Sequence, residues 1–266
     1  MNKKRSGFII CSLLILVLCF TASCGLFRRD NSLEKVLESG QLVLGMDANF
    51  PPMGYTDENG DLVGFDVDMA EEVCKRLGVT LVKQPINWDE KEDDLNTGRI
   101  DCIWNGLSVN SERAESMNLS DSYMFNELVF IINDQSSIKS IRELKGCTIG
   151  VQTGSSAETA LQKSDIFNEN DVIGTEDNLM LLEKLESGEI DAAFLDSIFA
   201  YYSIVKYNKN FFILPGNLGD EELAIGFRKD DSALRNRVQE VINEMAADGT
   251  LKSISEKWFG GDVTIK

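Results

Sequence analysis

Gly98-Arg-Ile-Asp-Cys-Ile-Trp-Asn-Gly-Leu-Ser-Val-Asn-Ser-Glu-Arg113 is the stretch around which the chain is organised. Gly98 ends a turn, and a short apolar strand is predicted to follow over 100–104. A polar loop is predicted over 105–108. Asn110 favours the start of a helix and places Arg113 in its first turn. Ligands of open α/β sheets bind at the carboxyl ends of strands. The pattern therefore predicts that backbone amides, a hydroxyl and one guanidinium meet at a ligand site.

Arg113 has two readings at that position. As an ordinary surface residue it would be a solvated helix side chain. However, cations are disfavoured at the positive start of a helix, so its place there indicates a specific use. A guanidinium binds a carboxylate through two parallel hydrogen bonds. We therefore expect Arg113 to recognise an acid.

The chain begins with a pattern typical of a secretory signal. A basic start with Lys3 and Arg5 precedes an apolar run over 8–20, and Thr21-Ala-Ser-Cys24 follows. The run is shorter than the ~20 residues of a membrane-spanning helix. Small residues before Cys24 resemble a bacterial lipoprotein cleavage box with Cys24 as the lipid-bearing residue. We expect a lipoprotein with a signal peptide over 1–23 and a tether over 24–32; a soluble secreted protein or an uncleaved anchor are the alternatives.

Removal of residues 1–23 leaves 243 of 266 residues and changes the net charge from −18 to −21, because three basic residues are lost. Such acidity argues against binding to nucleic acid or to an anionic lipid surface. Cys74, Cys102 and Cys147 remain outside the signal and anchor, in apolar surroundings and without a Cys-x-x-Cys spacing, so buried free thiols are expected.

The chain contains no histidine, which excludes Ser-His and Cys-His nucleophile pairs and His-ligated metal sites. A glycine-rich nucleotide loop and a carboxylate-rich metal loop are also missing from the sequence. We therefore expect neither an enzyme nor a protein with a cofactor or metal.

Periodicity and end signals give the expected elements. Helices are predicted over 33–38, 66–77, 140–146, 155–163, 178–187, 197–206, 232–247 and 251–259, with a solvated helix over 89–95. Strands are predicted over 42–46, 80–83, 100–104, 128–132, 147–151 and 224–227. Asp57-Glu-Asn-Gly60 predicts a hairpin.

Two internal matches indicate that the chain repeats itself. Leu95-Asn-Thr-Gly-Arg-Ile-Asp and Leu185-Glu-Ser-Gly-Glu-Ile-Asp share Leu-x-x-Gly-x-Ile-Asp, and helix–glycine–strand junctions open both halves at 37–45 and 144–150. Together they favour two similar α/β lobes, each a mixed sheet flanked by helices. We expect lobe 1 over 33–130 and 225–266 and lobe 2 over 131–224, with 128–132 and 224–227 as a two-strand hinge.

The strand ends of two facing lobes would converge on a cleft. Arg113 and the amides at the helix start of Ser155 and Ser156 would hold a carboxylate, and Asp196 would hold an ammonium. Phe50 and Trp88 would form flat apolar walls. This set matches an α-amino acid zwitterion. The expected site residues are Asp47, Phe50, Trp88, Asn105, Gly106, Ser108, Arg113, Gln152, Ser155, Ser156 and Asp196.

Structural roles would account for several of these residues equally well. Asp196 could cap the helix that follows it, Phe50 and Trp88 could belong to the core, and Ser155 caps its helix in either case. Asp101 and Asp191 are expected to have structural turn roles.

Ordered motifs over residues 33–260 resemble the family 3 solute-binding proteins of amino-acid ABC transporters. They are Asp47-Ala-Asn-Phe-Pro-Pro, Val63-Gly-Phe-Asp-Val-Asp-Met-Ala, Gly98-Arg-Ile-Asp, Ser111-Glu-Arg, Ser120-Asp-Ser-Tyr, Gln152-Thr-Gly-Ser-Ser and Ala193-Phe-Leu-Asp. The resemblance implies a two-lobed periplasmic-binding-protein-like fold of type II that closes on one amino acid. It assigns the carboxylate to Arg113 with Ser108 and the Ser155–Ser156 amides, and the ammonium to Asp196 with Gly106 and Ser108.

The same resemblance assigns side-chain contacts to Phe50 and Trp88, and positions that vary with the ligand to Asp47 and Gln152. Asn110 stands where the family usually has Thr, and Ser122 where it usually has Pro. Because no second pocket cation is evident, a polar uncharged or cationic side chain is expected.

The resulting expectation is a monomeric, lipid-anchored extracytoplasmic receptor that passes a free amino acid to ABC permease subunits. A sensing lipoprotein without a permease, and a dehydratase on the same scaffold with Asp47 as its acid, are the alternatives.

Overall fold

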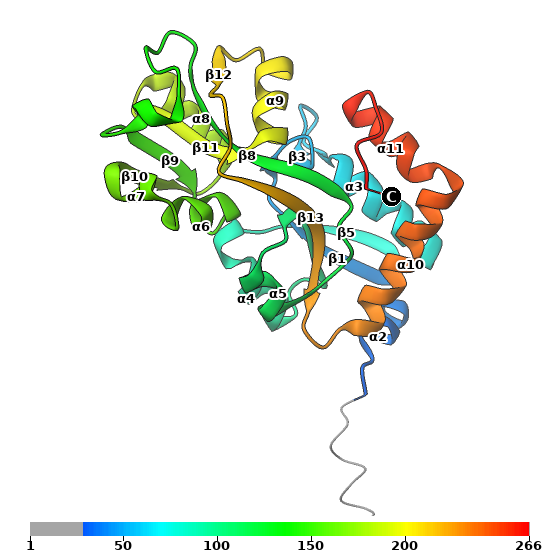
Figure 1. Ribbon diagram of the computed structural model, residues 1–266. Coiled ribbons are helices and arrows are strands. Elements are labelled where there is room, and N and C mark those ends of the chain that lie inside the picture. The colour runs from blue at the N-terminus through cyan, green and yellow to red at the C-terminus, as the bar shows by residue number, and fades with distance from the viewer. Residues whose placement is uncertain (1–28, 266) are drawn as a thin grey trace, which may run out of the picture. The chain divides into compact units, whose positions relative to one another are not determined.

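The computed structural model describes residues 29–265, of which those from Ser32 onward belong to one unit. The expected signal peptide and the expected lipid-bearing Cys24 lie outside the described residues. Most described elements belong to a ten-stranded mixed sheet and the helices on its faces (Figure 1). A smaller three-stranded sheet contains the hairpin that Asp57-Glu-Asn-Gly60 predicted.

The elements of the first part of the chain follow the expected alternation. Its helices are α2 (Ser32–Ser39), α3 (Phe65–Leu77), the 3₁₀ helix η2 (Trp88–Glu90), α4 (Lys91–Thr97) and α5 (Ser111–Ser116). Its strands are β1 (Gln41–Met46), β2 (Asn49–Phe50), β3 (Gly54–Thr56), β4 (Leu62–Val63), β5 (Thr80–Pro85), β6 (Cys102–Ser108) and β7 (Met117–Leu119).

The second part begins with the long strand β8 (Met124–Asn133). It continues through η3 (Ile141–Leu144), β9 (Thr148–Gln152), α6 (Ser156–Gln162), α7 (Asp165–Glu169), β10 (Asp171–Thr175), α8 (Asn178–Ser187), β11 (Ala192–Asp196), α9 (Ser197–Lys206) and β12 (Phe211–Ile213). The chain then returns through β13 (Gly219–Arg228) to α10 (Ser232–Asp248) and α11 (Thr250–Phe259).

The two halves are built alike, as the internal repeat predicted. β1 pairs in parallel with β5 and β6, and β9 pairs in parallel with β10 and β11. The aspartate of each repeated motif has the same role: Asp101 Oδ2 accepts the Val43 amide at 2.9 Å, and Asp191 Oδ2 accepts the Thr148 amide at 2.8 Å. Each carboxylate thus ties the entry of one strand to its parallel neighbour, and the expected structural roles are confirmed.

β8 and β13 join the two lobes in the middle of the sheet, whose order is β10-β9-β11-β8-β13-β6-β1-β5. Figure 1 shows both strands running side by side between the lobe with β9–β11 and the lobe with β1 and β5. They pair with each other at 124–128 and 219–223. The expected hinge segments, 128–132 and 224–227, lie mainly just beyond these paired segments. There β8 pairs with β11, and β13 pairs with β6 and β7.

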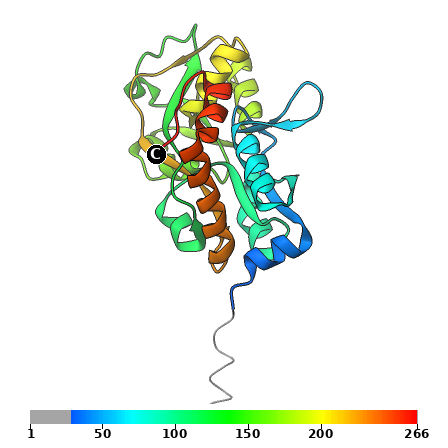
Figure 2. The same ribbon diagram turned by 90° about the vertical axis from the view of Figure 1, so that its right-hand side faces the viewer.

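The last helices pack against helices from the first part of the chain. α10 contacts α2 and α3, and α11 contacts α3 (Figure 2). The Leu234 amide donates to Ser32 Oγ at 3.1 Å, so the hydroxyl of α2 satisfies one of the free amides at the start of α10. Apolar side chains fill the interior of both lobes, including fully buried Trp104 in the first and Phe194, stacked on Phe130, in the second.

Three expectations differ from the structure. The polar stretch 105–108 is not a loop but the end of β6, because β13 offers it pairing partners at Ala224 and Leu223. The segment after Ser140 forms only a 3₁₀ turn, in which Ser140 Oγ bonds the Glu143 carboxylate and caps no amide. The acidic helix α4 is not solvated on all sides, since Lys91 and Leu95 are buried.

The three cysteines outside the N-terminal segment are free thiols, as expected. Cys74 and Cys102 are buried, and Cys147 is half-buried.

Candidate functional site

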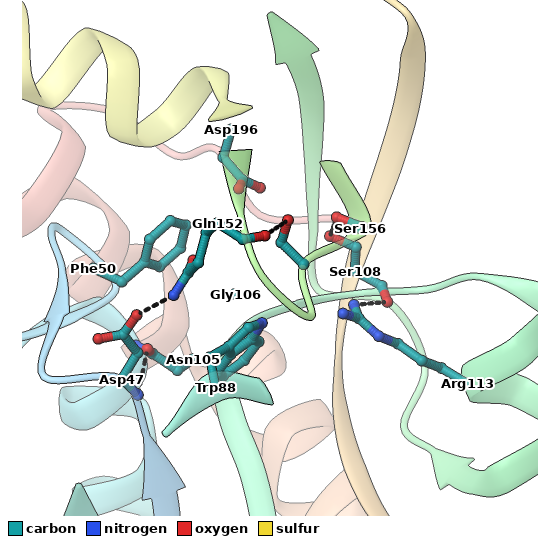
Figure 3. A pocket seen from close by; sticks show the side chains of 11 residues that line it. Asp47, Phe50, Trp88, Asn105, Gly106, Ser108, Arg113, Gln152, Ser156 and Asp196 are labelled. Atoms are coloured by element: carbon teal, nitrogen blue, oxygen red, sulfur yellow. Dashed lines mark hydrogen bonds between the residues drawn. The ribbon is translucent and has the colours of Figure 1, made fainter. Parts of the chain in front are cut away.

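One pocket between the two lobes brings together all of the residues that the sequence analysis proposed for the site (Figure 3). The space they surround measures about 290 Å³, part of it open to solvent. The lining residues are Asp47, Phe50, Trp88, Asn105, Gly106, Ser108, Arg113, Gln152, Ser155, Ser156 and Asp196. Seven come from the first lobe and four from the second, so the pocket exists only where the lobes face each other.

Arg113 reaches the pocket from α5 and is 4% exposed. The Asn110 side chain caps α5 by accepting the Arg113 amide at 2.8 Å, which confirms the predicted cap. The guanidinium donates to the Ser108 carbonyl at 2.8 Å and, more weakly, to the Gly154 carbonyl at 3.4 Å. Burial lowers the pKa of Arg113, and the nearby Glu221 opposes this shift. Within the described part of the chain, no carboxylate forms a salt bridge with Arg113.

Asp196 ends β11 on the opposite lobe and is the residue before α9. Its carboxylate caps no amide of that helix, so the alternative role as a side-chain cap is not realised. It accepts from Asn126 Nδ2 at 2.6 Å, and the same amide nitrogen donates to Glu221 at 3.0 Å. Burial, followed by the negative charge of Glu221, raises the pKa of Asp196 to about 8. A cation beside Asp196 would lower this pKa, because it favours the ionised carboxylate.

Asp47 and Gln152 form a polar end of the pocket. Gln152 Nε2 donates across the lobes to Asp47 Oδ2 at 2.9 Å. The side-chain oxygen of Gln152, Oε1, accepts from Asn178 Nδ2 at 2.6 Å. The Asp47 amide donates to Asn105 Oδ1 at 3.0 Å, which fixes the end of β1 to β6. Burial raises the pKa of Asp47 to about 6, although the bond from Gln152 partly offsets the shift.

Phe50 and Trp88 are both buried and both face the pocket, so they combine the core role and the wall role. Phe50 stacks on Phe199 of the second lobe, with the ring centroids 5.7 Å apart and the planes 4° from parallel. Gly106 lies under the same ring with φ +62°, and a Cβ there would be 2.7 Å from Phe50 Cε1. The glycine thus lets the ring and the β6 backbone approach each other closely.

Two of the three serines, Ser108 and Ser156, connect the lobes. Ser156 Oγ donates to Ser108 Oγ at 3.0 Å, and Ser108 Oγ donates to Glu221 at 2.9 Å. Ser155 Oγ caps α6 by accepting the Glu158 amide at 3.0 Å, as predicted. The Ser155 amide already donates to the Gln152 carbonyl at 3.3 Å, whereas the Ser156 amide, at the first residue of α6, has no acceptor within the helix.

Several neighbouring residues escaped the sequence analysis. Asn126 and Glu221 lie on β8 and β13, and Lys91 and Asp66 lie on α4 and α3. Asp66 is fully buried and accepts from the Gly106 amide at 2.7 Å and from Tyr123 Oη at 2.9 Å, and burial raises its pKa to about 7. It holds the β6 end in place. The only sequence signals were an aspartate inside the Gly64-Phe-Asp-Val-Asp motif and a lone lysine in an acidic run.

Residues 29–265 contain no cluster of three or more Cys, Asp and Glu side chains arranged for a metal ion. The same range contains no helix with the length and apolar character needed to cross a membrane.

Two lobes joined by two strands, with a buried guanidinium and a buried carboxylate on opposite walls of the space between them, define a binding protein that encloses a small solute. Comparison with known families gives the same class. Residues 42–261 match the model of the bacterial extracellular solute-binding proteins, family 3, and the chain belongs to this family.

The relatives include binding proteins for different solutes. The L-cystine-binding protein TcyJ of Escherichia coli (strain K12) is 31% identical over 90% of this chain and 90% of its own length. The arginine-binding extracellular protein ArtP of Bacillus subtilis (strain 168) is 30% identical over 94% of this chain and 98% of its own. A substrate-binding protein of an ABC uptake transporter from Streptococcus pneumoniae, solved with bound histidine, has a TM-score of 0.87 and 33% identity over 90% of this chain and all of its own.

Proposed function

We propose that this chain is the extracytoplasmic substrate-binding component of an ABC importer, and that it binds a polar amino acid between its lobes. The observation that carries the proposal is the pair Arg113 and Asp196. Both are buried in one pocket, on opposite lobes, and neither forms a salt bridge with another described residue. Burial without a partner disfavours the ionised form of each side chain, and the carboxylate and ammonium of one amino acid would supply both missing partners.

The other end of the pocket supports a polar side chain. Phe50 and Trp88 bound the middle of the space, and beyond them Asp47 and Gln152 present a carboxylate and an amide. This combination suits an uncharged polar or a cationic group. Relatives that bind cystine, arginine and histidine agree with a polar ligand but differ in its charge.

Binding would proceed by closure of the lobes about β8 and β13. A ligand held by Arg113 on one lobe and Asp196 on the other favours the closed state, because only that state offers both contacts. We further propose lobe 1 over 33–130 and 225–266 and lobe 2 over 131–224. The antiparallel pairing of β8 and β13 at 124–128 and 219–223 supports a hinge near these limits.

We also propose that the mature protein is a monomer held at the outer face of the cell membrane by a lipid on Cys24. The support is the basic start, the apolar run and the small residues before Cys24. From there the protein would deliver its free amino acid to the membrane subunits of a permease.

The test is a thermal-shift panel of the twenty amino acids with cystine and ornithine. A ligand that binds only the folded state raises the apparent melting temperature by mass action. We expect one or a few polar members to raise it, and isotope-labelled uptake by cells that carry the cognate permease to follow the same order. No shift with any member would contradict the proposal.

Two alternatives can be separated from transport. A sensing lipoprotein would bind the same ligands but would leave uptake unchanged when its gene is deleted. A dehydratase on this scaffold would use Asp47 as its acid, and turnover of a prephenate-type compound would identify it.

A further inference from the structure

Lys91, the first residue of α4, is a buried cation beside the pocket rather than in its lining. Only 4% of it is exposed, although its neighbours Asp89, Glu90 and Asp93 are exposed acids. A cation at the start of a helix opposes the helix dipole. Within the described ranges its ammonium has no carboxylate at salt-bridge distance, and its acceptors are two backbone carbonyls.

Those two carbonyls belong to different lobes. Lys91 Nζ donates to the Trp88 carbonyl at 3.0 Å within the first lobe and to the Gly154 carbonyl at 2.8 Å in the second. The ammonium also lies 5.3 Å from the centre of the Trp88 ring. It therefore connects one wall of the pocket directly to the loop that faces it.

Gly154 gives a second and independent sign that the lobes meet at this point. Its φ is +72°, and a Cβ on it would lie 2.8 Å from Cα of Asp89 in the first lobe. A residue with a side chain could not bring the loop this close to η2. The carbonyl of Gly154 is thus brought to Lys91 by backbone contact between the lobes.

The position of Gly154 decides where the next residues lie. Ser155 caps α6 and Ser156 begins it, and Ser156 Oγ bonds Ser108 of the first lobe. Arg113 Nη2 approaches the same Gly154 carbonyl at 3.4 Å. A loop seated on Lys91 therefore places the start of α6 next to the guanidinium that would hold the carboxylate of the ligand.

We propose that Lys91 is a positioning residue of the closed state, whose ammonium binds the Gly154 carbonyl when the lobes close and holds the 152–156 loop over the ligand. The inference rests on the proposed function, because it assigns to Lys91 the retention of a bound amino acid. Lys91 touches no ligand and acts through the loop and through Trp88.

The charges explain why this contact would respond to ligand. Burial and, to a smaller extent, the neighbouring Arg113 lower the pKa of Lys91 to about 8. Two buried cations repel each other when the pocket lacks an anion. A ligand carboxylate at Arg113 offsets this repulsion, so the Lys91–Gly154 contact is stronger in the loaded protein than in the empty one.

The test compares Lys91→Met with Lys163→Met, which removes an equal charge from an exposed position. Stopped-flow measurements use the amino acid that gives the largest thermal shift. We expect Lys91→Met to raise the dissociation rate about tenfold and to change the association rate little, because the contact forms after encounter. X-ray scattering should show that Lys91→Met needs more ligand to contract than the unmodified protein, and Lys163→Met should match the unmodified protein in both measurements.

Gly154→Ala attacks the same contact from the other lobe, and by itself it tests whether this contact retains the ligand if Lys91→Met does not fold. It should also raise the dissociation rate, and the double variant should release ligand no faster than Gly154→Ala alone, because the two changes remove one interaction. Additive effects, or a dissociation rate of Lys91→Met equal to that of Lys163→Met, would overturn the role of Lys91. If the unmodified protein binds no amino acid, the proposed function fails instead, so the two failures are distinguishable.

Discussion

Gln152 Nε2 of the second lobe lies 2.9 Å from Asp47 Oδ2 of the first, and this bond closes the polar end of the pocket. Asp47 is the carboxylate that lines this end of the pocket. Its place at the end of β1, fixed through the Asn105 amide group, makes it part of a rigid wall. The charge of this wall should therefore decide between classes of side chain.

Asp47→Asn should lower affinity for cationic amino acids at least about tenfold while changing affinity for neutral ones much less, because only the former lose a charge pair. Titration calorimetry with arginine, ornithine and glutamine measures the ratio. Asp171→Asn, at an exposed position, is the control. An equal loss for both classes would mean that Asp47 holds the loop rather than the ligand.

Arg113→Ala should weaken binding of every amino acid by roughly 2–5 kcal/mol, because it leaves the ligand carboxylate unpaired in a buried site. Asp196→Ala should have an effect of the same size through the ammonium. Calorimetry gives the affinity, and circular dichroism checks that both variants fold. The exposed Arg142→Ala serves as the control. Unchanged affinity in either pocket variant would remove that residue from the site.

Asp196→Asn should make the ligand-free protein more stable at pH 7.5 even though it weakens binding. Burial and Glu221 raise the pKa of Asp196 from 3.8 to about 8 in the folded protein. The folded state then holds a proton that the unfolded state releases, so its stability falls as pH rises from about 4 to about 8. The amide carries no charge and avoids this loss.

Calorimetric melting at pH 4 and pH 7.5 measures the effect. The gain of Asp196→Asn over the unmodified protein should be present at pH 7.5 and small at pH 4. A gain of the same size at both values would show that the carboxyl of Asp196 does not titrate in this range.

Gly106→Ala should impair the pocket beyond its backbone strain. Its φ of +62° disfavours a side chain by about 1 kcal/mol, and its Cβ would meet the Phe50 ring at 2.7 Å. Gly60→Ala is the matched control, since Gly60 has φ +86° but open space around it. Both variants should lose similar stability from strain, while only Gly106→Ala should lose ligand affinity. Equal affinities in the two variants would contradict the close packing of Phe50 on Gly106.

Asp191→Ala should cost about 1 kcal/mol of unfolding free energy, because it removes the acceptor of the Thr148 amide. Asp101→Ala should cost more, since Asp101 accepts the Val43 amide and also bonds Arg228 Nη2 at 3.2 Å. Urea denaturation measures both. The reverse order would mean that the two motifs, alike in sequence, are not alike in energetics.

The repeated architecture could be predicted because it rests on local signals. Gly98 and Gly188 each end a helix in the left-handed conformation, and each is followed by Ile-Asp and a buried strand. Such end signals depend on the backbone within a few residues. The proximity of the site residues could also be predicted from the sequence, because parallel strands bring their carboxyl ends to one edge of the sheet.

What escaped prediction depends on partners far away in sequence. Residues 105–108 look like a polar loop and become strand only because β13, more than a hundred residues later, pairs with them. Glu221 and Asn126 carry no local pattern, and their role arises where β8 and β13 cross beside Asp196. The acidic sequence around Lys91 predicts a solvated helix. Lys91 is nevertheless buried, because the surface that covers it includes the other lobe.

The antiparallel pairing of β8 with β13 has a thermodynamic consequence for this molecule. Two strands paired with each other form a ladder, so the lobes can turn mainly by a change of twist along it, with the backbone hydrogen bonds at 124–128 and 219–223 kept throughout. Few torsions are released on opening and few are frozen on closing. The conformational entropy lost when the lobes come together is therefore small. Most of the free energy of the contacts between ligand and protein then contributes to affinity.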